Sequence, residues 1–291
     1  MHGVVTALPD LSIRQLEYLV AVADAPTWAM AAAEVGVSPS ALSQGLAELE
    51  RRIGVPLFER VGRRRVLRDA AAPVLDHARQ VVALTGDLTR WADRARAADV
   101  GAVRLGMLDV AAVHHYPEVL ARFRADHPEL QLHLRVAPSS TLLELLTAGE
   151  LDLVVCVEPH EPVRGVAFEP ILTEELAVYR PDGKRAGPPS GWGPWVLFPV
   201  GSHTRQVIAE ELARLGAPIE VVAESHQPDV LREMVQLGLG WTVLPVAQAE
   251  TGERPLRRAR VLTDRRLVAA VRDSAVLDPA VDALRDVLTA A

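Results

Sequence analysis

A run of short polar side chains followed by arginines occupies residues 38–65 and has the chemistry to contact nucleic acid. Hydroxyl and amide groups near the start of a helix can reach base edges in a major groove, while guanidinium groups bind phosphate. The candidates for base contact are Ser38, Ser40, Ser43 and Gln44, and those for the phosphate backbone are Arg51, Arg52, Arg63, Arg64 and Arg65. By themselves the serines also fit a solvated helix face with a capping residue.

A second set of polar side chains lies in four loops that follow predicted strands or open predicted helices. Ligands of α/β proteins bind where strands end and helices begin, because free backbone amides and hydroxyls gather there. The candidates for binding a small molecule are Leu108, Asp109, Val110, Ser139, Ser140, Thr141, Ser202, His203, Thr204, Arg205 and His226. Residues 139–141 also fit a plain helix cap, whether or not a ligand binds there.

Other chemistries find little support in the sequence. It contains no glycine-rich phosphate loop and no nucleophile elbow, so we expect no catalytic site and no cofactor. The nine histidines show no close pair with helical spacing and carboxylate support, so we expect no metal site. Cys156 is the single cysteine, which excludes an intrachain disulfide, and its apolar surroundings predict a buried, inert thiol.

Three short helices and a hairpin would position the DNA-facing set. Apolar residues recur at helical spacing over residues 13–23, over residues 27–35 and from residue 39 onward, where Ser38 would be the N-cap and Pro39 the first helical residue. Gly36 would form the turn between the last two helices, which is the helix-turn-helix pattern. The basic turn at residues 62–65 lies between two short apolar segments and predicts a two-stranded wing.

A long helix is predicted over residues 70–98, after a DNA-binding domain over residues 1–69. Its small and apolar residues alternate three and four positions apart, which is the spacing of a short coiled-coil seam and predicts a dimerisation helix. The residues of this seam are Ala78, Val81, Thr85, Leu88, Ala92 and Ala95. From residue 101 strands alternate with helices in two successive sets, which predicts two doubly wound α/β lobes. The apolar runs at residues 176–179 and 267–271 are two of the predicted strands. We expect lobe I to span about residues 101–172 and 267–291 and lobe II about residues 173–266, with a loop at residues 182–194.

The charge of the chain differs between the predicted DNA-binding part and the predicted α/β lobes. The chain has 291 residues and a net charge of −7, which by itself argues against a nucleic-acid partner. Residues 1–100, however, carry as many arginines as acidic residues, and seven of these arginines fall between Arg51 and Arg68. All of the net negative charge therefore lies in residues 101–291. We also find no run of about 18 apolar residues and no secretion signal, and we expect a cytoplasmic protein without a membrane partner.

The order of these parts resembles the LysR-type transcriptional regulators. The resemblance is carried by Leu16–Val22 (LEYLVAV), Val37–Ser43 (VSPSALS), Arg51–Arg60 (RRIGVPLFER), Gly149–Leu153 (GELDL) and Gly238–Gly240 before Leu244-Pro245. It implies a winged helix-turn-helix, a dimerising linker helix and a C-terminal effector domain with two lobes like those of periplasmic binding proteins. It also implies a dimer or tetramer on an inverted repeat in promoter DNA, with a small-molecule inducer held between the lobes.

Departures from the family pattern predict how this chain differs. Family members commonly carry a glutamine where this chain has Pro39, and Gln44-Gly45 stands in place of the usual Arg-Gln, so phosphate contacts on the helices are fewer. Leu108 and Val110 stand where relatives that bind small polar anions have hydroxyls, and a carboxylate at Asp109 would repel an anion. These residues predict an inducer with an apolar or aromatic body and allow an amine on it. A solute-binding protein and an α/β enzyme are the alternative functions.

Overall fold

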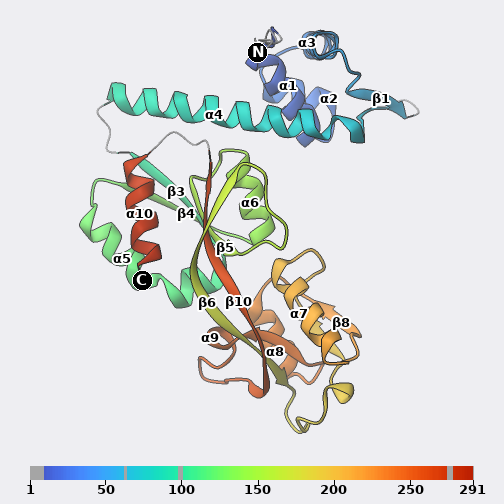
Figure 1. Ribbon diagram of the computed structural model, residues 1–291, viewed down its shortest axis with the longest axis vertical. Coiled ribbons are helices and arrows are strands. Elements are labelled where there is room, and N and C mark those ends of the chain that lie inside the picture. The colour runs from blue at the N-terminus through green and yellow to red at the C-terminus, as the bar shows by residue number, and fades with distance from the viewer. Residues whose placement is uncertain (1–9, 62–63, 98–100, 274–277, 291) are drawn as a thin grey trace, which may run out of the picture. The chain divides into compact units, whose positions relative to one another are not determined.

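The computed structural model describes residues 10–61, 64–97, 101–273 and 278–290 (Figure 1). Residues 1–93 and 94–291 form two compact units, and each is described by itself. The first unit contains three helices, a hairpin and most of a long helix, and the second is an α/β domain. The fold class predicted from the sequence is therefore confirmed.

The first unit is built from helices whose ends are set by their capping residues. The helices are α1 (Ile13–Asp24), α2 (Trp28–Glu34) and α3 (Pro39–Ile53), and the strands are β1 (Phe58–Val61) and β2 (Arg64–Leu67). Thr27 and Ser38 accept hydrogen bonds from backbone amides in the first turns of α2 and α3, and Gly54 ends α3 with a left-handed φ of 78°. β1 and β2 pair antiparallel and form the predicted hairpin.

Helix α3 packs closely on α1 because position 45 is glycine. A Cβ at Gly45 would lie 2.8 Å from Cδ2 and Cε2 of the Tyr18 ring, which is closer than carbon atoms approach without displacement. Tyr18 is 9% exposed and belongs to the core of this unit. The glycine costs helix propensity, about 1 kcal/mol relative to alanine. Its presence in the helix follows from the ring against which it packs.

The long helix α4 (Ala72–Ala97) follows a short 3₁₀ turn, η1 (Asp69–Ala71). Of the residues in the predicted seam, Ala78 is fully buried in the core of the first unit and Leu88 is 57% exposed. Val81 and Thr85 are half-buried, and the Thr85 hydroxyl donates to the Val81 carbonyl at 2.8 Å. The first residue of the seam is thus buried in the core of the first unit, and the seam is exposed near its middle. The side chain of Ala95 lies outside the described residues.

The second unit contains a six-stranded sheet in the order β4-β3-β5-β10-β6-β9. Its strands are β3 (Ala102–Met107), β4 (Gln131–Val136), β5 (Leu153–Val157), β6 (Val166–Arg180), β9 (Thr242–Pro245) and β10 (Arg257–Arg272). β3, β4 and β5 are parallel, and β10 pairs antiparallel with both β5 and β6. Four helices share a hydrophobic core with β3 and β5, namely η2 (Ala111–His115), α5 (Pro117–Asp126), α6 (Ser139–Thr147) and α10 (Pro279–Thr289). Together with β3, β4, β5 and the parts of β6 and β10 beside them, these helices form lobe I.

Lobe II is inserted between the two longest strands. Its own elements are β7 (Trp195–Leu197), β8 (Val221–Glu224), β9, η3 (Pro189–Gly191), α7 (His203–Arg214), α8 (Pro228–Gln236) and α9 (Val246–Ala249). β7 and β8 are parallel, and a bridge between Trp195 and Trp241 connects β7 to the start of β9. Figure 1 shows β6 and β10 running side by side from one lobe into the other, and each lobe has its own hydrophobic core.

The extent of these two strands differs from the sequence prediction. The apolar runs at residues 176–179 and 267–271 predicted two short strands, but these runs are only the buried ends of strands of 15 and 16 residues. The remaining parts, such as Thr173–Glu175 and Arg257–Arg260, are largely polar, and no hydrophobic run marks them. Pairing between the two strands forms a ribbon that links the lobes. Backbone pairing over this length holds polar residues in a strand that their composition does not predict.

Candidate functional site

A cavity of about 440 Å³ lies between the two lobes of the second unit. Lobe I provides the carboxyl ends of its three parallel strands, at Leu108, Val136 and Val157. Lobe II provides the residues after β7 and β8 and the first turns of α7 and α8. This is the edge at which α/β sheets bind ligands, and the size is typical of a small-molecule site.

Seven of the eleven residues predicted to bind an effector line this cavity, namely Leu108, Asp109, Ser139, Ser140, Ser202, Thr204 and His226. Val110 is fully buried in the core of lobe I, and Thr141 lies in the first turn of α6. His203 lines a second cavity of about 380 Å³, and its Nδ1 lies 3.3 Å from the Val157 carbonyl oxygen. Seven of the predicted residues thus line one cavity, and the side chains of the other four do not line it.

The surroundings of Arg205 differ from those expected of a residue that binds an anionic ligand. It is 9% exposed, and its Nη1 donates to the Phe198 carbonyl at 3.4 Å. Burial lowers the pKa of the guanidinium, and the charge of Glu224 partly opposes this shift. The side chain is thus hydrogen-bonded to the backbone that follows β7, and it does not line the cavity.

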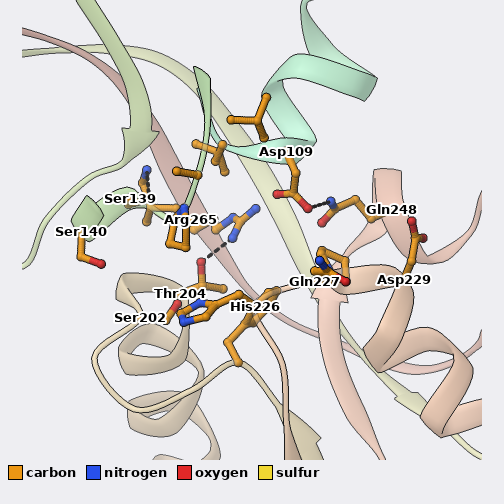
Figure 2. Close-up of a pocket in the computed structure, with 17 residues that line it drawn as sticks. Asp109, Ser139, Ser140, Ser202, Thr204, His226, Gln227, Asp229, Gln248 and Arg265 are labelled. Carbon is orange, nitrogen blue, oxygen red and sulfur yellow. Dashed lines mark hydrogen bonds between the residues drawn. The ribbon is translucent and has the colours of Figure 1, made fainter. Parts of the chain in front are cut away.

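Sequence reasoning missed several residues of the cavity, of which Arg265 and Gln248 are both polar and buried. Arg265 is 4% exposed and comes from β10, and Gln248 is 6% exposed and comes from α9. Figure 2 shows Arg265 in the middle of the cavity and Gln248 at its side, facing Asp109. The other residues missed are Val136, Ala137, Pro138, Val157, Phe198, Gln227, Pro228 and Asp229. Arg265 follows a polar segment with no motif, so no sequence signal pointed to it.

The guanidinium of Arg265 is held by partners on both sides of the cavity floor. Its Nη2 lies 2.5 Å from Oε1 of Glu174 in β6, and both side chains are at most 5% exposed. Its Nη1 donates to the Thr204 hydroxyl of α7 at 2.5 Å. Oε2 of Glu174 is 2.9 Å from Nε2 of His115, at the end of η2 in lobe I. A continuous polar chain therefore runs beneath the cavity from lobe II to lobe I.

This chain keeps Glu174 ionised. Burial, the largest single influence on its pKa, favours the neutral carboxyl group. The charge of Arg265 and the hydrogen bonds from His115 and Arg265 act in the opposite direction and together outweigh burial, so the pKa of Glu174 is lowered. His115 belongs to a π-helix over residues 111–115, a rare element that frequently occurs at functional sites.

The hydroxyl groups of the three serines that line the cavity differ in their hydrogen bonds. Ser139 is 9% exposed, and its hydroxyl accepts the backbone N–H of Val157 at 3.1 Å, which ties α6 to the end of β5. The Ser202 hydroxyl caps α7 by accepting from the Arg205 amide. The Ser140 hydroxyl makes no hydrogen bond with the described residues and faces the cavity (Figure 2). Ser140 is thus the hydroxyl that is free for a ligand.

In the first unit the predicted base-contacting residues lie on one end of α3. Ser38, Ser40 and Gln44 are exposed and Ser43 is half-buried. The Ser38 hydroxyl accepts from the Ala41 amide at 3.2 Å and lies 2.9 Å from the Ser40 hydroxyl. Ser38 therefore caps the helix, as the sequence predicted, and the other three present polar groups to solvent.

The predicted phosphate contacts are partly engaged within the unit. Arg51 and Arg52 both pair with Glu48, at 2.5 Å in each case. Hydrogen bonds from these arginines lower the pKa of the half-buried Glu48 to about 2. At the C-terminal end of α3 these cations are thus already paired with a carboxylate.

In the wing, Arg65 pairs with Glu50 at 2.6 Å, and its guanidinium lies 5.1 Å from the ring centre of Trp28 and 4.9 Å from that of Phe58. These contacts hold Arg65 against the helices. Arg63 and the side chain of Arg64 lie outside the described residues.

Redox, metal and membrane features are limited within the described residues. Cys156 is fully buried in β5, and burial raises the pKa of its thiol to about 12, which suppresses the reactive thiolate. Among the residues that the structure describes, no group of three or more His, Cys, Asp or Glu side chains could hold a metal ion. No helix in the described part of the chain is long and apolar enough to cross a membrane.

Comparisons with known proteins match both parts of the chain. Residues 13–72 match the family described as "Bacterial regulatory helix-turn-helix protein, lysR family", and residues 96–291 match "LysR substrate binding domain". The chain is 31% identical to a probable hydrogen peroxide-inducible genes activator of Streptomyces viridosporus, over 87% of this chain and 83% of the relative. It is 28% identical to the uncharacterized regulator YfeR of Shigella flexneri, over 96% and 94% of the two chains.

Among solved structures, the chain is similar in fold to full-length CbnR in complex with its target DNA. The TM-score is 0.60 at 21% identity, with 96% of this chain and 99% of that chain covered. At this identity the similarity concerns the fold.

Proposed function

The chain belongs to the LysR family of bacterial transcriptional regulators, and we propose that it senses its inducer in the cavity between lobes I and II. It is a DNA-binding regulator rather than an enzyme, and its C-terminal domain binds a small molecule. We assign DNA binding to residues 1–69, dimerisation to the helix over residues 70–98 and inducer binding to residues 101–291. Because its target is promoter DNA, we place its action in the cytoplasm.

The observation that carries this proposal is the composition of the cavity walls. Residues of both lobes face the same space of about 440 Å³, so a ligand there would contact both and stabilise one arrangement of the lobes over others. Leu108, Val136 and Val157 of lobe I and Phe198 of lobe II provide apolar walls. They support the proposal of an inducer with an apolar or aromatic body.

For DNA, we propose that Ser40, Ser43 and Gln44 face base edges and that Ser38 orders the start of α3. Arg51, Arg52 and the arginines at positions 63–65 would contact phosphates. Arg51, Arg52 and Arg65 are paired with glutamates, so each phosphate contact competes with an existing ion pair. The exposed part of the α4 seam around Leu88 supports pairing of two chains, with a dimer or a tetramer as the working form.

The DNA-binding part is tested by a gel-shift titration of the full chain against the DNA upstream of its own gene and a shuffled fragment of equal length. We expect sequence-preferring binding that weakens as salt rises, because counterions are released from the phosphates. Replacing the arginines at positions 63–65 by alanine should flatten the salt dependence. Equal affinity for both fragments, or an unchanged salt slope in the variant, contradicts the assignment.

The ligand-binding part is tested by a thermal-shift screen of metabolites on the full chain. Each compound that stabilises the protein is retested on Ser140→Phe, which fills the cavity, and on Ser140→Ala, which removes its free hydroxyl. We expect the shift to vanish in the first and to shrink in the second. Thr147→Ala at the other end of α6 is the matched control and should respond like the parent. Full stabilisation of Ser140→Phe would place the inducer elsewhere.

A further inference from the structure

We propose that the ligand of the interlobe cavity carries a positively charged nitrogen, which binds between Asp109 of lobe I and Gln248 of lobe II. This inference rests on the proposed function of the cavity and specifies the chemistry of its ligand. It derives from the charges and the unused hydrogen-bond acceptors of the side chains that line the cavity.

The charge of the lining favours a cation. Its described acidic residues are Asp109 and Asp229, and its one arginine is Arg265. Arg265 is neutralised by Glu174 at 2.5 Å and donates a further bond to Thr204, so an anionic ligand would have to compete with an existing buried pair. Asp109 makes no ion pair with any described residue. The cavity thus presents a carboxylate without a cation and a cation that already has a carboxylate.

The hydrogen-bond acceptors of Asp109 and Gln248 also favour a cationic ligand at this wall of the cavity. The Gln248 amide nitrogen donates one of its two hydrogens to Oδ2 of Asp109 at 3.0 Å, which orients the amide and identifies its oxygen as the acceptor. Gln248 is 6% exposed, and its side-chain oxygen accepts no hydrogen bond from the described residues. The second carboxylate oxygen of Asp109 also lacks a partner among them. Two acceptors with spare capacity therefore lie next to each other at one wall (Figure 2).

An ammonium group satisfies this pair because it has several donors and a full positive charge. Bound there, it would donate to the carboxylate of one lobe and to the amide oxygen of the other. The apolar body of the ligand would then lie along the walls formed by Leu108 and Phe198. The free amides at the start of α6 remain available for a neutral acceptor or a carboxylate elsewhere on the same ligand.

The probes are two matched sets of compounds added to the full chain in a thermal-shift assay and in isothermal titration. The first set is phenethylamine, phenylalanine, 2-phenylethanol and 3-phenylpropanoate, and the second is isopentylamine, leucine, isopentanol and isovalerate. We expect stabilisation by at least one compound that carries an amine and none from the alcohols or the simple carboxylates. Stabilisation by the carboxylates or alcohols alone, or by no member of either set, overturns the proposal.

The variants then locate the charge. Asp109→Asn should weaken amine binding about tenfold or more, which is the effect expected for losing a hydrogen bond to a charged group. Gln248→Lys supplies an ammonium from the chain itself and should abolish amine binding. Asp286→Asn on α10, which does not line the cavity and whose replaced side chain is 76% exposed, is the matched control and should change affinity less than threefold. DNA binding in a gel shift shows that each variant is folded.

These results separate the two proposals. If carboxylates or alcohols bind, and Ser140→Phe abolishes their binding, the cavity remains the inducer site while the charged nitrogen is refuted. If amines bind equally well to the parent and to both Asp109→Asn and Gln248→Lys, the charged-nitrogen site is refuted as well. Amine binding that is lost in these two variants and retained in Asp286→Asn supports it.

Discussion

The Glu174–Arg265 pair should behave as a buried ion pair whose two members cannot be removed separately. Their closest atoms are 2.5 Å apart, and the side chains are 5% and 3% exposed. Removing one partner leaves an uncompensated buried charge, which costs about 3–5 kcal/mol in other proteins. Glu174→Gln keeps a neutral acceptor for the guanidinium, so we expect about 3 kcal/mol. For a unit of this size that corresponds to a fall in Tm of about 6–12 °C.

The assay is thermal unfolding of the full chain followed by circular dichroism, with urea unfolding as a second measure. Glu158→Gln is a matched control, because Glu158 pairs at 2.8 Å with Arg266, the next residue along β10, at 36% and 60% exposure. An exposed pair contributes about 0–1 kcal/mol, so this control should melt within a few degrees of the parent.

The double variant Glu174→Leu/Arg265→Met provides the stricter comparison. Replacing both members of a buried pair by apolar residues is often neutral or stabilising, so the double variant should be more stable than Glu174→Gln. The reasoning is refuted if Glu174→Gln melts together with Glu158→Gln, or if the double variant is less stable than the single one.

Three further predictions concern the pH dependence of this ion pair, the packing of Gly45 and the burial of Cys156. Because the pKa of Glu174 is lowered in the folded chain, its stabilisation is present above the unfolded pKa of about 4.3 and is lost as pH falls through the folded pKa, so the advantage of the parent over Glu174→Gln should shrink in urea titrations below about pH 4. A larger advantage at low pH would contradict this sign. Gly45→Ala should destabilise the first unit by about 1 kcal/mol despite better helix propensity, because its Cβ meets the Tyr18 ring, and it should become stabilising in a Tyr18→Leu background. Cys156 should not react with a chromogenic disulfide reagent at pH 8 until the protein is unfolded in guanidinium chloride, since its thiol is buried with a pKa of about 12; rapid labelling of the native chain would show that the lobe opens.

Sequence patterns predicted the parts of this chain in which local chemistry decides the structure. Ser38 before Pro39 marked the start of α3, and the hydroxyls after β4 marked the start of α6. At α3 the Ser38 hydroxyl accepts from the backbone amide of Ala41, so the signal is contained in the local sequence. At α6 the predicted helix cap is wrong: the N-cap is Pro138, which makes no side-chain cap hydrogen bond, and the Ser139 hydroxyl accepts from the distant Val157 amide instead.

What could not be predicted depends on contacts between distant segments. Arg265 and Glu174 are 91 positions apart and meet only because β10 pairs with β6. Gln248 and Asp109 are 139 positions apart and come from different lobes. His203 follows Ser202 directly yet faces another cavity, because neighbouring side chains at the start of a helix point in different directions. No local pattern encodes such pairings.

The paired strands β6 and β10 have a mechanical consequence. They are the two strands that carry the chain into and out of lobe II, and their register shifts between Leu267 and Val268, where Pro170 lies opposite Val268. Such a bulge increases local twist, and it is a place where proline is tolerated because a ladder hydrogen bond is missing there. A two-stranded ribbon of this kind resists sliding, since sliding breaks its ladder, but it yields to torsion. We therefore expect the ribbon to twist and not to slide when an inducer shifts the two lobes, so that lobe II turns about this axis and the backbone pairing of the ribbon stays intact.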